Sequence, residues 1–282
     1  MHIVVTIKQV PDTSEVRIDP KTNTMVRGGV PSIVNPDDTH AIEEAVRLKE
    51  RHGGRVTVLS MGPPQAIAAL REAISYGADE AVLCSDRGFA AADTLATSYV
   101  LWAAIRKLDE EEPVDLVLAG KQAIDGDTGQ VPPGVATRLG WPQLTYVRRI
   151  LEFDPQARRI RVERLADGGI ELLESRLPAV VTVGREINEP RYASLPNMLR
   201  AARYQPRIWD RKTLNLDETK IGLRGSPTIV SKVWAPPRRQ RPPVIMLSHG
   251  DRDPDAVAAD LLDRLIADGA FDWAPTPAPA AR

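Results

Sequence analysis

One loop of this chain combines residue types that suit the binding of an anion. Gly120 to Gln130 reads Gly-Lys-Gln-Ala-Ile-Asp-Gly-Asp-Thr-Gly-Gln, follows an apolar run and leads into a predicted helix. Glycines let a backbone approach a phosphate closely, and the free N–H groups at a helix start hold it. The loop fits neither the G-x-G-x-x-G pattern nor the Walker A pattern. It favours nucleotide binding, and the alternative is a well-capped loop without a ligand.

The side chains of this loop have different expected roles. Thr128 and Gln130 add hydrogen-bond donors for a phosphate. Asp125 and Asp127 are expected to point away from it, as caps or as partners of ribose hydroxyl groups.

Three further loops follow predicted strands, at Lys8–Asp12, Ser60–Pro64 and Ser85–Phe89. Ligands of open parallel sheets bind at the carboxyl ends of the strands, so these loops are candidates for the same site. The Gly62-Pro63 pair is equally compatible with an ordinary turn.

Side-chain catalysis finds little support in the sequence. Asp37 and Asp38 resemble a carboxylate pair, but acids at a helix start more simply complement the helix dipole. Cys84, at a strand end, favours buried packing over a nucleophilic role. No G-x-S-x-G motif is present, and the histidines lack metal-ligand spacing: His2, His40, His52, His249. We therefore expect no catalytic side chain and no metal site, and any electron chemistry must come from a bound cofactor.

Apolar runs alternate with amphipathic stretches up to about residue 145. Asn35 is expected to cap a helix that Pro36 begins and Gly53-Gly54 ends. A strand is predicted at 2–8, a surface hairpin at 16–26, further strands at 56–60, 81–84 and 114–119, and further helices at 64–76, 91–108 and 131–139. The alternation indicates an α/β fold, a mostly parallel, Rossmann-like nucleotide-binding sheet with helices on both faces.

The pattern changes after residue 145. Short strands are expected at 146–151, 159–164, 170–174 and 180–183, as antiparallel edge strands of the sheet or as a small lobe. From residue 188 regular signals are sparse, apart from a helix that Asp253 caps and Gly269 ends. We expect a nucleotide-binding domain at 1–187 and an extended C-terminal arm at 188–282, lying along the domain or along another chain. The basic run 238–241 fits a solvated linker or an acidic partner chain equally well.

Composition excludes several classes of protein. The 282 residues include 37 Lys+Arg and 38 Asp+Glu, so the net charge is -1. This charge gives no overall electrostatic attraction to nucleic acid or anionic lipid. No apolar run approaches the roughly 20 residues that span a bilayer, and the start is too soon polar for a signal peptide. The single cysteine excludes an intrachain disulfide. We expect a cytoplasmic protein, or one of a matrix-like compartment, without membrane insertion or a nucleic-acid partner.

Several motifs together resemble one family, the β subunit of electron-transfer flavoprotein. The resemblance runs from residue 1 to about residue 204. It rests on Lys8-Gln9-Val10-Pro11-Asp12, Asn35-Pro36, Ala-Ile-Ser-Tyr-Gly-Ala-Asp at 73–79, Gly-Lys-Gln-Ala-Ile-Asp-Gly-Asp at 120–127, Leu177-Pro178, and Asn-Glu-Pro-Arg-Tyr-Ala-Ser-Leu-Pro-Asn at 188–197.

The resemblance implies a heterodimer in which a larger α subunit holds the electron-carrying FAD. The β subunit holds a second adenine nucleotide, AMP in ordinary members and FAD in electron-bifurcating members, where it accepts a hydride from NADH. The implied cofactor-binding residues are Thr6, Lys8, Asn35, Asp38, Ser60, Met61, Gly62, Thr94, Thr97, Gly120, Lys121, Gln122, Ala123, Ile124, Asp125, Gly126, Asp127, Thr128, Gly129, Gln130 and Val131.

The resemblance favours FAD as this second nucleotide and leaves AMP as the alternative. Asp125 to Val131 is similar to the bifurcating versions. So is Asp86 to Ala90 together with Asp93 to Thr97, where Thr94 and Thr97 would place hydroxyl groups on a second phosphate. Against FAD, the residue after Asn35-Pro36 is Asp37, where bifurcating members often carry an aromatic side chain. A carboxylate there would disfavour a reduced, anionic flavin.

Residues 188–203 resemble the recognition loop with which the family binds an acyl-CoA dehydrogenase. The implied docking residues are Arg191, Tyr192, Leu195 and Pro196, with Leu195 as the apolar anchor. The alternative is a structural arm against the α subunit. For the whole chain, the rival interpretation is a stand-alone adenine-nucleotide-binding sensor without redox function.

Overall fold

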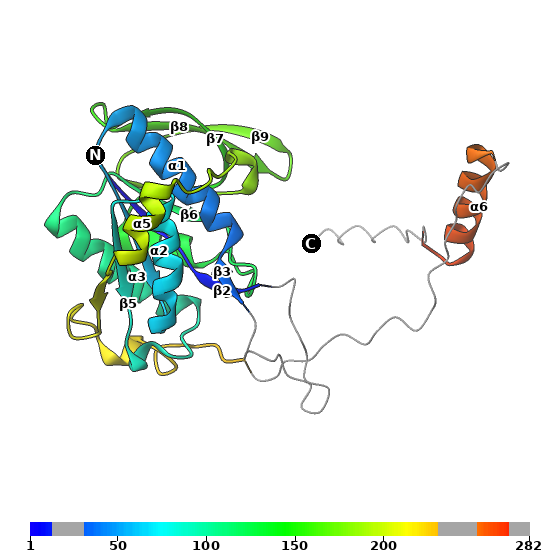
Figure 1. The fold of residues 1–282 in the computed structure, drawn as a ribbon. Helices are drawn as coiled ribbons and strands as arrows, with labels where there is room; N and C mark the ends of the chain where they lie inside the picture. Colours follow the sequence, from blue (N-terminus) through cyan, green and yellow to red (C-terminus); the bar gives the residue numbers. More distant parts are fainter. Residues whose placement is uncertain (13–30, 231–252, 271–282) are drawn as a thin grey trace, which may run out of the picture. The chain divides into compact units, whose positions relative to one another are not determined.

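The computed structural model describes residues 1–12, 31–230 and 253–270 (Figure 1). The chain divides into two compact units, Met1–Trp234 and Ala235–Arg282. Residues 188–230, grouped above with the arm, therefore belong to the same unit as residues 1–187. The predicted hairpin at 16–26, the basic run at 238–241 and the tail lie outside the described residues.

A sheet with strand order β11-β5-β4-β1-β6-β10-β7-β8-β9 forms the centre of the first unit. Neighbouring strands from β11 to β7 are parallel, and β8 and β9 continue the sheet antiparallel to β7. A small antiparallel pair, β2 and β3, lies outside it. The strands are β1 (His2–Thr6), β2 (Gln9–Pro11), β3 (Ser32–Val34), β4 (Arg55–Met61), β5 (Glu80–Cys84), β6 (Leu116–Gly120), β7 (Gln143–Asp154), β8 (Arg159–Ala166), β9 (Gly169–Arg176), β10 (Ala179–Val183) and β11 (Arg207–Trp209).

Helices cover both faces of the parallel part, as predicted. The first face carries α1 (Pro36–His52), α2 (Ile67–Ser75) and α5 (Leu195–Arg203), and Figure 1 shows α5 beside α2. The second carries α3 (Thr94–Glu111) and α4 (Val131–Leu139). Short 3-10 turns are η2 (Pro64–Ala66), η3 (Arg87–Phe89), η4 (Arg185–Ile187) and η5 (Glu218–Lys220).

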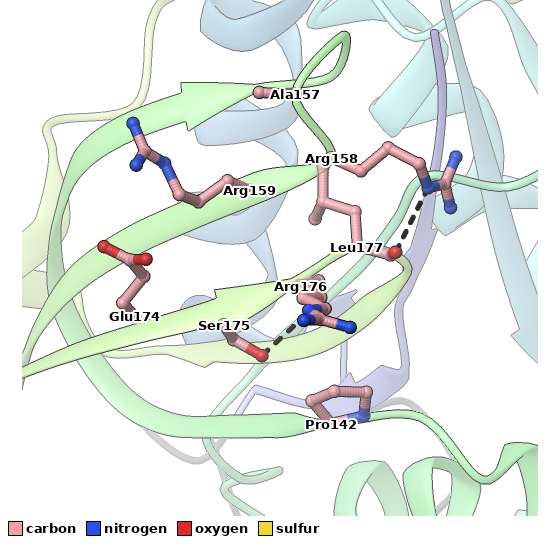
Figure 2. Close-up of a pocket in the computed structure, with 8 residues that line it drawn as sticks. All are labelled: Pro142, Ala157, Arg158, Arg159, Glu174, Ser175, Arg176 and Leu177. Atoms are coloured by element: carbon pink, nitrogen blue, oxygen red, sulfur yellow. Dashed lines mark hydrogen bonds between the residues drawn. The ribbon is translucent and has the colours of Figure 1, made fainter.

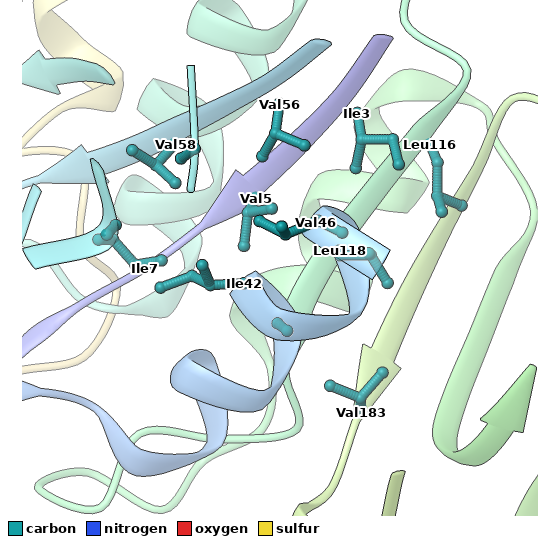
Figure 3. Close-up of a cluster of buried hydrophobic side chains, with 14 of the residues drawn as sticks. Ile3, Val5, Ile7, Ile42, Val46, Val56, Val58, Leu116, Leu118 and Val183 are labelled. Carbon is teal, nitrogen blue, oxygen red and sulfur yellow. The ribbon is translucent and has the colours of Figure 1, made fainter. Parts of the chain in front are cut away.

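The core of the first face shows how sequence period becomes packing. Alternate residues of β1, such as Ile3 and Val5, meet Ile42 and Val46 of α1, which lie four residues apart on one helix stripe (Figure 3). All four side chains are buried. This packing fixes α1 across β1 and so sets where the first turn of α1 reaches the sheet.

The strand order reverses at β1. The chain passes from β1 to β4 and β5 on one side, and then returns to place β6 on the other side of β1. In open α/β sheets such a reversal leaves a crevice beyond the carboxyl end of the strand, where ligands bind. The fold therefore directs attention to the residues that follow β1, β4 and β6.

Three sequence expectations were wrong in detail. β10 was expected as an antiparallel edge strand, but it is parallel to both β6 and β7. Its residues are buried throughout, and such uniformly apolar runs are typical of parallel strands covered on both faces. Helix α3 begins at Thr94 rather than Ala91, because the Asp93 carboxylate accepts the N–H groups of Leu95 and Ala96.

The third correction concerns the region after residue 188, which is more regular than expected. Helix α5 begins there with Ser194 as its cap, whose hydroxyl accepts the Asn197 N–H, and with Pro196 in its first turn. Strand β11 adds to the sheet beside β5. A three-residue strand carries too little pattern to be recognised in a sequence.

The second unit contains α6 (Pro254–Ala267), which matches the predicted helix. The Asp253 carboxylate accepts the Asp255 N–H at 3.2 Å, and Gly269 has a φ of +71°. Among the described residues, no helix is both long and apolar enough to cross a membrane.

Candidate functional site

Asn35 connects the start of α1 to the loop at 120–130. It was expected to cap the helix, but its side chain makes no capping hydrogen bond. Instead Nδ2 donates to the Gln122 carbonyl at 2.9 Å, and Oδ1 accepts the Ile124 N–H at 3.1 Å. The residue is fully buried. A buried amide with both ends bonded fixes the loop in one position.

Asp38 connects the ends of two strands. Its Oδ2 accepts the Lys8 N–H at 2.7 Å, just after β1, and its Oδ1 accepts the Gly120 N–H at 3.1 Å, at the end of β6. Burial raises the pKa of Asp38 to about 7, although these two N–H donors favour the ionised form. Asp38 is thus a structural acceptor at the strand reversal, beyond the helix-dipole role considered above.

Asp37 forms an ion pair with Arg185, a residue that was not predicted from the sequence. Its buried Oδ1 lies 3.0 Å from Nε of Arg185, which belongs to η4 after β10. The position of Arg185, two residues beyond a strand, was the available signal, because strand ends in a parallel sheet share one edge. The Asp37 charge is therefore compensated within the chain.

Gly120 occupies a place where no side chain fits. A Cβ there would lie 2.8 Å from the Asp37 carbonyl carbon and still closer to Asp38 Oδ1. Glycine is needed so that β6 can pass directly against the first turn of α1.

The acids of the loop are held by neighbours. Both oxygens of Asp125 lie 2.7 Å from Lys8 Nζ, and Asp127 Oδ1 accepts from Gln122 Nε2 at 3.0 Å. Both acids are thus paired within the chain, and their expected role as caps or as partners of ribose hydroxyl groups stays a prediction.

The second half of the loop presents unpaired donors. Within the described part of the chain, the backbone N–H groups of residues 128–131 donate to no acceptor. Gly129 has a φ of +60°, and Gln130 follows with a φ of -92° and a ψ of -22°. Successive residues of left- and right-handed conformation form a concave nest of N–H groups that binds anions. The nest lies at the start of α4, where the helix dipole adds positive potential.

The starts of α3 and α4 lie next to each other. The Thr94 hydroxyl donates to Gln130 Oε1 at 3.0 Å. Thr97 is half-buried in the first turn of α3. The first free N–H groups of α3 are accepted by Asp93, which also accepts the N–H and hydroxyl of Thr228. Thr94 therefore faces the loop, while the cap of α3 is already occupied.

The predicted residues on β1 and β4 lie at the ends of adjacent strands. Thr6 is in register with Leu59 and Ala119. Gly62 donates its N–H to the Cys84 carbonyl at 3.1 Å. Ser60 is buried on the same strand face as Val58, and its hydroxyl has no hydrogen-bond partner among the described residues. Among the predicted residues outside the loop, those whose side chains form hydrogen bonds with it in the described chain are Lys8, Asn35, Asp38 and Thr94.

Two cavities lie away from this edge. One, of about 670 Å³, is lined by Pro142, residues 157–159 and residues 174–177 (Figure 2). It lies beside the start of β7 and β10, where Pro142 O accepts the Val180 N–H. The other, of about 490 Å³, lies between α2 and α5. Neither contains a predicted cofactor-binding residue.

The chemistry that the carboxyl edge offers is the binding of an anion. Its free groups are N–H donors, and its acids are paired or serve as backbone acceptors. Burial raises the pKa of the Cys84 thiol to about 12, which disfavours a thiolate nucleophile at neutral pH. The described residues contain no group of His, Cys, Asp and Glu that could hold a metal ion.

The predicted docking residues fall into two kinds. Tyr192 is fully exposed and Leu195 is 69% exposed, as an apolar contact surface requires. Pro196 belongs to the first turn of α5. Arg191 is not free, because its guanidinium binds Glu43 and Glu50 of α1.

Comparison with known proteins assigns the family. A profile described as "Electron transfer flavoprotein domain" matches residues 22–212. The chain belongs to the electron transfer flavoprotein family. Protein FixA of Azotobacter vinelandii is 53% identical over 94% of this chain and 95% of that protein. The electron transfer flavoprotein subunit beta of Clostridium acetobutylicum is 50% identical over 82% of this chain and 87% of that protein.

These similarities confirm the resemblance read from the sequence. As an electron transfer flavoprotein β subunit, the chain acts in electron transfer with flavin and has an α subunit as its partner. Nothing in them favours a stand-alone sensor.

Proposed function

We propose that the carboxyl edge of the sheet holds the adenine nucleotide of this β subunit, with its phosphate on the N–H groups of residues 128–131. The observation that carries this proposal is the nest of four unpaired donors beside the strand reversal. Lys8, Asn35 and Asp38 hold the loop in place, and Thr6, Ser60, Met61, Gly62 and Thr97 complete the proposed site.

We propose further that the nucleotide is FAD. The contact between Thr94 and Gln130 brings a hydroxyl group of α3 beside the nest of α4, which suits a ligand with two phosphates. The Asp37 carboxylate, the argument against FAD, is buried and bound by Arg185, so its charge is compensated. When bound here, FAD supplies a second flavin that accepts a hydride from NADH. AMP is the alternative ligand.

The partner surface is proposed for residues 188–282. Tyr192, Leu195 and Pro196 would contact an acyl-CoA dehydrogenase or another flavin dehydrogenase, and their exposure supports this role. The arm with α6 would pack on the α subunit. The cytoplasm is the proposed compartment.

The substitution Gln130→Glu tests the nest. Glutamate keeps an acceptor for the Thr94 hydroxyl, so the loop should keep its structure, but it adds a negative charge beside the donors. We expect the heterodimer to lose most of its second nucleotide while the α-held FAD stays. Gln156→Glu, an exposed site on the β7–β8 turn, is the control. Full nucleotide content in Gln130→Glu would refute the proposed phosphate position.

A further inference from the structure

Four exposed apolar side chains lie in and just before α5. Tyr192 precedes the helix, and Leu195, Met198 and Leu199 share one face of it, because they lie three and four residues apart. Each is more than half exposed. We call these residues the apolar strip. Because more than half of each side chain is exposed, burial contributes little to the ordering of the strip, and its conformation depends largely on how its two ends are held.

Arg191 holds the amino end of the strip on α1. Its Nε donates to Glu43 at 2.8 Å, and its backbone N–H donates to the same oxygen at 3.1 Å. Its Nη1 and Nη2 donate to Glu50 at 2.5 and 3.0 Å. Glu43 is buried, so this is a charge-assisted pair in a water-poor site. Only the planar guanidinium fork can reach both carboxylates at once.

The residues just before Arg191 are held on the same helix. The Asn188 amide donates to the His40 carbonyl and to Glu44, at 3.0 and 3.1 Å. Arg47 donates to the Glu189 carbonyl at 3.0 Å. Hydrogen bonds to α1 thus hold Asn188, Glu189 and Arg191. The next side chain, Tyr192, is fully exposed.

Arg200 holds the carboxyl end of the strip on α2. Its Nη2 donates to the Ile74 and Ala78 carbonyls at 3.1 and 2.5 Å, at the end of α2, where a cation also complements the helix dipole. The Tyr204 hydroxyl accepts the Ala81 N–H at 2.9 Å just beyond. The apolar strip therefore lies between Arg191, which is bound to α1, and Arg200, which is bound to the end of α2.

We propose that Arg191 and Arg200 are positioning residues, which hold the apolar strip in one conformation for a flavin dehydrogenase partner. The inference rests on the proposed docking function. It reassigns Arg191 from a contact residue to an anchor, since its donors are already used within the chain. Ordering the strip before the partner arrives removes part of the entropy cost of association.

Hydrogen exchange of the holo-heterodimer tests the anchors without any partner. We expect the amides of residues 192–199 to exchange about tenfold faster, or more, in Arg191→Gln and in Arg200→Gln. Glu50→Gln removes only the exposed ion pair of Arg191 and leaves the one with Glu43, so it should give a smaller increase in the exchange rate. Arg203→Gln is the matched control, because the exposed Arg203 side chain makes no hydrogen bond or ion pair with the described residues and lies on the same helix. Unchanged exchange in both anchor variants would overturn the inference.

Electron transfer from a reduced acyl-CoA dehydrogenase separates the anchors from the docking function. Arg191→Gln and Arg200→Gln should raise the KM for the heterodimer several-fold, with kcat and flavin content unchanged. Leu195→Ala should also raise the KM, but without faster exchange at its neighbours. An unchanged KM in Leu195→Ala would refute docking through the strip, whereas unchanged exchange in the arginine variants would refute positioning alone.

Discussion

Ser60 and Ser98 are equally buried, but only one has its hydroxyl group satisfied. The Ser98 hydroxyl donates to the Leu95 carbonyl at 2.8 Å, whereas the Ser60 hydroxyl has no partner in the described chain. An unpaired buried polar group costs about 1–3 kcal/mol. Ser60→Ala should therefore raise the free energy of unfolding of the nucleotide-free chain by about 1 kcal/mol, and Ser98→Ala should lower it by a similar amount.

Urea unfolding of the two serine variants measures this difference. If Ser60→Ala destabilises the chain as much as Ser98→Ala, the hydroxyl of Ser60 has a partner after all. The nucleotide content of Ser60→Ala then decides whether this residue belongs to the nucleotide site. If the content is unchanged, Ser60 is not part of the site.

Asp38 should make stability depend on pH. Its pKa is raised from 3.8 to about 7 by burial, so the folded state holds the proton more tightly than the unfolded state between these values. The contribution of Asp38 to stability is therefore present at low pH and lost as the pH rises toward 7. The free energy of unfolding of the unsubstituted chain minus that of Asp38→Asn should fall by up to about 1.4 kcal/mol per pH unit. A difference that rises with pH would contradict the raised pKa.

At the residue scale, the sequence indicated which residues to consider better than it indicated their hydrogen-bond partners. Asn35 and Arg191 were both singled out, but their partners were not, since Asn35 bonds a loop 87 positions away and Arg191 an acid 148 positions away. Such pairings depend on the tertiary fold. Arg185 was missed for the same reason.

Among the elements, the loop at 120–131 depends on the close approach of β6 to α1. Gly120→Ala should lower stability by about 1–3 kcal/mol, the cost of an overpacked site, because the added methyl group would overlap Asp37 and Asp38. Gly126→Ala is the matched control in the same loop, since a Cβ there meets nothing within 4 Å. Thermal unfolding of both variants measures the effect, and equal midpoints would contradict the close approach.

Element boundaries were predicted best where proline, glycine or a cap marks them. Helix α4 begins and ends at the predicted residues, between the loop and Gly140, and α1 lies between Pro36 and Gly53. The direction of β10 was predicted wrongly because this strand was grouped with the antiparallel strands before it, although its uniformly apolar residues are typical of a parallel strand covered on both faces. Helix α5 carried the signals of Ser194 and Pro196, but they were hidden in a segment without a long apolar stripe.

For the whole molecule, the sequence predicted an α/β fold with a mostly parallel sheet, and the structure confirms it. What it could not give was the strand order, and with it the reversal at β1 that brings the loops after β1 and β6 together. Pairing of β1 with β4 and β6 joins segments that are distant in the chain. The candidate site is therefore a consequence of topology as much as of the loop sequence.

The nucleotide content of the purified α/β heterodimer tests the central claim most directly. Acid releases the bound nucleotides, and FAD and AMP are then counted per heterodimer. We expect two FAD and no AMP, with the second FAD lost in Gln130→Glu. One FAD and one AMP would place the adenine nucleotide at the site but contradict the flavin, and a single FAD with no second nucleotide would contradict the site itself.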